Sequence, residues 1–124
     1  MQQRKLRFIE EFRVAITGSR AQAAEMVIAP GDAEGGPTNR HEGADQWLFV
    51  LAGSGTAHIE GERIVLRQHM LLLIEQGEQH EIRCDGEVPL QTLNFYVPPA
   101  YAKNGKRLPR GKSRAVSGET RGSS

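Results

Sequence analysis

Residues 39–53 read NRHEGADQWLFVLAG, and this stretch decides the fold when it is taken together with His80 further along the chain. It places polar side chains that can bind a ligand at Asn39, His41 and Gln46. Asn39 and His41 are two residues apart, so in a strand their side chains point to the same face. We therefore predict adjacent strands whose polar side chains converge with His80 on one interior pocket.

The length of 124 residues predicts one domain. Hydrophobic content of 38% and charged content of 25% are ordinary for a globular protein. A single cysteine, Cys84, excludes an internal disulfide framework. The basic start has no long apolar run behind it, which argues against a signal peptide, and no stretch approaches the roughly 18 apolar residues of a membrane span. We expect a cytoplasmic protein with no membrane partner.

Charge is distributed unevenly along the chain. Residues 1–102 carry 9 Lys/Arg and 14 Asp/Glu, whereas residues 103–124 carry 7 basic residues and only Glu119 as an acidic one. We predict a domain over 1–102, with an N-terminal extension, and a basic, disordered tail over 103–124. The tail has no aromatic residue for base stacking, so a solvated tail is favoured over a nucleic-acid-binding one.

Short apolar runs between glycine- and proline-containing turns predict an all-β sandwich or barrel. Residues 19–26 have a helix-favouring composition, but we predict a strand over 21–28 because the apolar residues run directly into Pro30 and Gly31. Residues 2–7 are expected to form a short helix or coil. The apolar runs are Phe12–Ile16, Met26–Ile28, Trp47–Leu51, Met70–Ile74 and Leu90–Val97.

The stretch from residue 35 to residue 80 resembles the cupin family. The first cupin signature has a glycine, then His-x-His, three or four residues, Glu, six residues and Gly. Gln46 stands before Gly53 in the glutamate position, and His41 and Asn39 stand in the two histidine positions. The departures are therefore an asparagine for a histidine and a glutamine for the glutamate.

The second cupin signature has a glycine, five residues, Pro-x-Gly, two residues, His, three residues and Asn. Gly77 and His80 match it, whereas His69, Glu75 and Cys84 replace its first glycine, its proline and its asparagine. The resemblance implies a single-domain, all-β double-stranded β-helix, or jelly roll, in the form of a small cupin.

The resemblance also implies a divalent metal ion held by His41, Gln46 and His80, with Asn39 assisting. Two imidazoles and two amides carry no negative charge, so the ion would keep its full charge and favour anionic partners. Fe, Mn, Ni and Zn all suit these donors. The alternative is that both histidines line a ligand pocket without a metal, with Asn39 as a hydrogen-bonding residue.

Two main functions follow from the resemblance. The first is a small metal-dependent enzyme of oxygenase or isomerase type, acting on a small organic acid or diol; the second is a non-catalytic small-molecule-binding module, a sensor or a store. A third hypothesis is a nucleic-acid-associated protein whose tail supplies affinity. The amide at position 46 cannot accept a proton as a glutamate would, and no catalytic residue is assigned.

Strand parity predicts the direction of the remaining side chains. If Gln46 faces the interior, Trp47 and Phe49 face outward, which predicts a homodimer interface. Tyr96 and Tyr101 are candidates for substrate contact, with ordinary packing favoured. Three further side chains are expected to be structural or exposed: His58 facing solvent, His69 near a turn, and Cys84 as a small buried hydrophobe.

Overall fold

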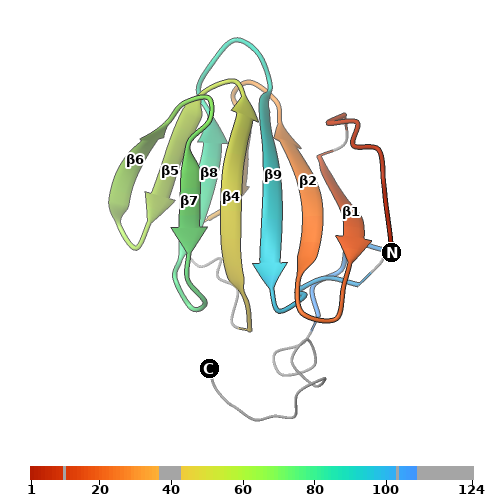
Figure 1. The fold of residues 1–124 in the computed structure, drawn as a ribbon. Coiled ribbons are helices and arrows are strands. Elements are labelled where there is room, and N and C mark those ends of the chain that lie inside the picture. Colours follow the sequence, from red (N-terminus) through yellow and green to blue (C-terminus); the bar gives the residue numbers. More distant parts are fainter. Residues whose placement is uncertain (10, 37–42, 103, 109–124) are drawn as a thin grey trace.

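The structure, a computed structural model, describes residues 1–9, 11–36, 43–102 and 104–108. Two antiparallel β-sheets stack on each other (Figure 1), and the described residues contain no helix, so none that could cross a membrane. The strands are β1 (Phe12–Thr17), β2 (Gln22–Ile28), β3 (Ala33–Gly35), β4 (Asp45–Ala52), β5 (Gly55–Ile59), β6 (Glu62–Leu66), β7 (Leu71–Ile74), β8 (His80–Cys84) and β9 (Leu90–Val97).

The strand order is that of a jelly roll. One sheet has the order β1-β2-β9-β4-β7 and the other the order β3-β8-β5-β6. The last strand, β9, is inserted between β2 and β4, and it pairs with β2 and with β4 in antiparallel registers. The all-β jelly-roll fold expected from the sequence is confirmed.

Alternating side chains on β4 divide the molecule into an inside and an outside. Gln46, Leu48 and Val50 are buried, whereas Trp47 is 39% exposed on the opposite face. Aliphatic side chains from both sheets fill the space between them, because each strand turns one face inward. The main core cluster comprises Met26, Ile28, Leu48, Val50, Ala57, Ile59, Leu66, Ile74, Ile82, Cys84 and Leu90.

The predicted strand over 21–28 is confirmed as β2. It pairs along its whole length with β9 and also with β1, so ladder hydrogen bonds on both edges outweigh the helix propensity of its alanines. Residues 2–7 contain no helix and follow an irregular path beside the sheet, which agrees with the coil alternative.

Two turn positions explain how the sequence signatures shape the backbone. Gly53 has a φ of 89°, and a Cβ there would lie 2.5 Å from the carbonyl oxygen of Pro89, so only glycine fits. His69 has a φ of 74°, which is the left-handed region. Its exposed ring stacks on Phe49 with 6.0 Å between ring centroids. The second signature has a glycine at position 69, and the left-handed backbone there explains why a glycine would suit this turn. This chain has histidine at the position instead.

Candidate metal and ligand site

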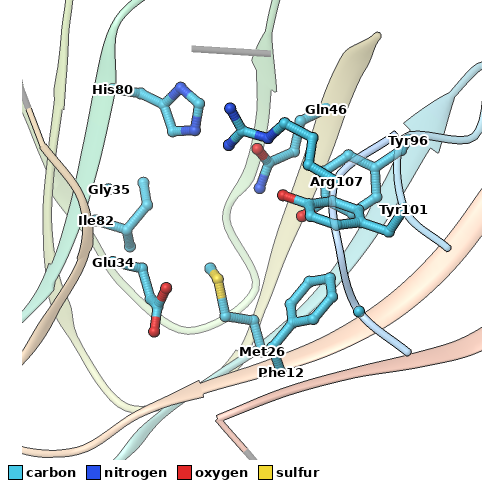
Figure 2. Close-up of a pocket in the computed structure, with 11 residues that line it drawn as sticks. Phe12, Met26, Glu34, Gly35, Gln46, His80, Ile82, Tyr96, Tyr101 and Arg107 are labelled. Atoms are coloured by element: carbon cyan, nitrogen blue, oxygen red, sulfur yellow. The ribbon is translucent and has the colours of Figure 1, made fainter. Parts of the chain in front are cut away.

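A cavity of about 260 Å³ lies between the two sheets, where β2, β3, β4, β8 and β9 meet the chain that follows β9. Figure 2 shows His80, Gln46 and Arg107 at one end of the cavity, and Glu34 with the apolar side chains of Met26 and Phe12 toward the other. Its size suits a small ligand. The lining residues are Phe12, Met26, Glu34, Gly35, Gln46, His80, Ile82, Tyr96, Tyr101, Gly105 and Arg107.

Gln46 presents a buried acceptor to this cavity. Its side-chain Nε2 donates to Oδ1 of Asn94 over 2.8 Å. Asn94 in turn donates to the Thr92 hydroxyl, which donates to the carbonyl oxygen of Met26. This chain of bonds fixes the orientation of the Gln46 amide, and its Oε1 is buried without a hydrogen-bond donor among the residues that the structure describes. A buried acceptor in that state is costly unless a ligand, water or cation satisfies it.

His80 begins β8 and is only 5% exposed. Its Nδ1 lies 3.2 Å from the carbonyl oxygen of Glu78. A carbonyl can only accept, so Nδ1 carries the proton and Nε2 carries the lone pair, as in metal-binding histidines. Burial lowers the pKa of His80 below 6.5; the Glu78 carbonyl opposes this shift, and the Arg107 guanidinium adds to it. The ring is therefore neutral at neutral pH.

The four residues of the predicted metal set are only partly described. Gln46 and His80 line the same cavity (Figure 2), whereas Asn39 and His41 lie outside the described residues. Among the residues that are described, no three His, Cys, Asp or Glu side chains form a cluster that could hold a metal ion. The orphaned amide oxygen and the neutral imidazole fit a divalent ion, which would need residues 39 and 41 to complete its coordination.

A positively charged side chain also lines the cavity, that of Arg107, which belongs to the basic tail predicted from the sequence. The backbone of Arg107 pairs with that of Tyr101 in an antiparallel bridge, and its side chain lines the cavity beside His80 and Gln46 (Figure 2). Arg107 also hydrogen-bonds the Tyr101 side chain, which hydrogen-bonds that of Tyr96. Burial raises the pKa of both tyrosines, so both hydroxyls stay protonated. Both tyrosines pack together and line the cavity, so packing and a ligand-facing position coexist.

Glu34 is the acid among the described cavity residues. It lies on β3 and pairs in register with Ile82. Its pKa is raised above 4.5 by burial, and the charges of Glu11 and Asp32 add to this rise. Its carboxylate has no hydrogen bond or ion pair with the residues that the structure describes.

None of the three side chains that the sequence predicted to be structural or exposed lines this cavity. Cys84 is 1% exposed in the core, and its thiol donates to the carbonyl oxygen of Val88. His58 is exposed and lies 4.0 Å from a Glu81 carboxylate oxygen. His69 is exposed at its turn.

The fold and the cavity define a small jelly-roll protein with an internal cavity between its sheets. A family model described as "Cupin domain" matches residues 24–96, and the chain belongs to this family.

Two curated relatives cover the same region. The chain is 29% identical over 72 residues to the tetracenomycin polyketide synthase protein TcmJ of Streptomyces glaucescens, which covers 58% of this chain and 46% of the relative. It is 27% identical over 74 residues to an oxalate-binding protein of Thermotoga maritima, which covers 60% of each protein. The chain thus spans less than two thirds of either relative.

Solved structures agree with the fold. A Bacillus halodurans protein superimposes with a TM-score of 0.65 at 26% identity, covering 74% of this chain and 73% of the other. A Thermotoga maritima protein described as a predicted oxalate decarboxylase gives a TM-score of 0.58 at 25% identity, covering 64% and 67%.

Proposed function

We propose that this cupin binds a small organic acid in the cavity between its sheets, together with a divalent metal ion. The ion would be held by His80 and Gln46, with His41 and Asn39 completing the set. The observation that carries the proposal is the buried Gln46 Oε1, for which the described part of the chain provides no hydrogen-bond donor. Gln46 lines the same cavity as His80 and Arg107.

The charge of the site supports an anionic ligand. A metal held only by imidazole and amide groups keeps its double positive charge, and Arg107, which lines the same cavity, adds a further positive charge. An organic acid would compensate both charges at once, and guanidinium is well suited to bind a carboxylate. The relative named as an oxalate-binding protein supports the same class of ligand.

Metal content tests the first half of the proposal. We expect protein purified without a histidine tag to contain close to one divalent ion per chain by elemental analysis. His80→Ala should lower that content roughly tenfold or more, while His58→Ala, which removes an exposed histidine outside this cavity, should leave it unchanged. Equal metal content in all three proteins would contradict the site.

Calorimetric titration with oxalate, phenylacetate and hexanoate tests the second half. For each acid that the wild-type protein binds, Arg107→Gln should lower the affinity about tenfold, because one charge-assisted interaction is lost. Lys106→Gln is the matched control, since Lys106 is exposed and does not line the cavity. Failure of all three acids to bind, or equal effects of the two substitutions, would refute the proposal.

A bound metal would supply Lewis acidity, on which oxygenase and isomerase chemistry of organic acids depends. The residues of this chain would bind the acid, exclude water and orient it between the sheets. Turnover assays in air with the acids that bind separate an enzyme from a non-catalytic sensor or store. Binding without turnover would assign the protein to the second class.

A further inference from the structure

The cavity has two chemically different ends, and the proposed function uses only one. The polar end contains Arg107, His80 and Gln46, whereas Glu34 lies toward the opposite end (Figure 2). A ligand held at Arg107 must therefore extend across the cavity to reach Glu34.

The region around Glu34 is apolar. Phe12, Met26 and Ile82 line the cavity beside it, and its carboxylate makes no hydrogen bond or ion pair with the part of the chain that is described. The nearby acids Glu11 and Asp32 disfavour its charge further. A half-buried carboxylate in such surroundings raises the free energy of the empty protein, and a hydrogen-bond donor on a ligand would lower it.

We infer that the ligand is an organic acid with an apolar body and a hydroxyl group at the end opposite its carboxylate, and that Glu34 accepts a hydrogen bond from this hydroxyl. The inference rests on the proposed function, because it places the carboxylate at Arg107. It adds a specificity-determining residue, since an acid without the hydroxyl leaves Glu34 unpartnered in the apolar part of the cavity. Recognition of a hydroxyl by a buried polar group discriminates strongly against analogues that lack it.

Two matched pairs of probes test the inference by calorimetric titration of the full chain. They are 4-hydroxyphenylacetate with phenylacetate, and 6-hydroxyhexanoate with hexanoate. Within at least one pair, the wild-type protein should bind the hydroxylated acid about tenfold more tightly than its partner. Glu34→Met, which keeps the length of the side chain and removes the acceptor oxygens, should abolish this preference and leave the affinity for the plain acid unchanged or higher.

Two further variants keep the test decisive. Glu11→Gln makes a similar change of charge at an exposed residue near Glu34, and it should preserve the preference for the hydroxylated acid. Glu34→Gln retains one acceptor oxygen and should reduce the preference less than Glu34→Met, so it replaces that variant if the latter does not fold. Binding of plain acids without any preference, or a preference that survives both substitutions of Glu34, overturns the inference and leaves the proposed function standing. Failure of all four of these acids to bind overturns the inference, and the proposed function falls with it only if oxalate also fails to bind.

Discussion

Glu25 is buried, with 1% of its surface exposed, and its carboxylate is surrounded by hydrogen-bond donors. Its Oε1 accepts from the backbone N–H groups of Arg7 and Phe8, and its Oε2 accepts from the Arg13 guanidinium. Burial alone would raise the pKa of Glu25, but these donors together outweigh burial and hold the pKa below 4.5. Glu25 thereby fastens the N-terminal segment to β1 and β2.

We expect Glu25→Gln to lower the free energy of unfolding by about 3 kcal/mol near neutral pH, because Arg13 loses its partner in a partly buried place. The pKa of Glu25 is lower in the folded protein, so its stabilising effect is present above its usual value of 4.5 and is lost as the pH falls through the lowered value. Urea unfolding of both proteins near neutral pH and in acid should show the difference shrinking in acid.

Glu62→Gln serves as the control, because Glu62 is exposed on β6. It should change the unfolding free energy by less than about 0.5 kcal/mol. A difference between wild type and Glu25→Gln that stays constant with pH would contradict the assigned role of the carboxylate.

Strand parity was sufficient to predict which way most single side chains point. It placed Gln46 and Cys84 inside and Trp47 outside, because the period of two is local. Glu34 and Arg107 could not be found in this way. Glu34 belongs to a three-residue strand followed by glycine, and Arg107 follows two prolines in a region of biased composition, so no periodicity connects either residue to the cavity.

At the scale of the elements, the position of the segment that follows β9 depends on one side chain of β2, that of Gln22. Gln22, 1% exposed, accepts with Oε1 from the backbone N–H groups of Ala100 and Tyr101, and its Nε2 donates to the Tyr101 carbonyl and the Thr17 hydroxyl. The backbone bridge between Tyr101 and Arg107 then connects this attached segment to Arg107, whose side chain lines the cavity. Gln22 is therefore a positioning residue for Arg107.

We expect Gln22→Ala to lower the free energy of unfolding by about 2 kcal/mol, since three bonds to the segment are lost at once. It should also remove most of the affinity that depends on Arg107, as seen when Arg107→Gln causes no further loss in the Gln22→Ala background. Thr17→Val is the control, because it breaks only the bond that does not reach the segment. Urea unfolding measures the first effect, and calorimetric titration with an acid that binds measures the second. Fully additive losses of affinity would show that Gln22 does not position Arg107.

The strands that the sequence predicted best are those with uninterrupted apolar runs, such as β4 and β9. Strand β8 reads HEIRC, and its alternating pattern has only Ile82 and Cys84 as apolar members, so no apolar run marked it; the resemblance placed His80 near the pocket instead. The position of β9 between β2 and β4 depends on pairing between distant segments, which local patterns do not encode.

At the scale of the whole molecule, the outer face of the five-stranded sheet is apolar and exposed over β4, β7 and β9. Trp47 is paired with Leu73 on one side and with Phe95 on the other, and the three side chains are 39%, 39% and 40% exposed. Leu71 and Val97 extend this patch on β7 and β9. A contiguous apolar patch over neighbouring strands is typical of an interaction surface, and a second copy of the chain would cover it with the same patch.

We therefore predict a homodimer in which the outer faces of two five-stranded sheets pack together. Phe95→Lys should convert it to a monomer in light scattering after gel filtration, because two unpaired ammonium groups would be buried near the symmetry axis. Trp47 is the sole tryptophan of the chain, so its emission should shift to longer wavelength both in this variant and when the wild-type protein is diluted.

Val65→Lys is the matched control, since Val65 is 42% exposed on β6 of the other sheet. It introduces the same charge at similar exposure and should leave the dimer and the tryptophan emission unchanged. A wild-type protein that is monomeric at all concentrations would refute the prediction, and so would a dimer that survives Phe95→Lys but is lost in Val65→Lys. The second result would show that the interface lies on the four-stranded sheet, on the side of the molecule away from Trp47.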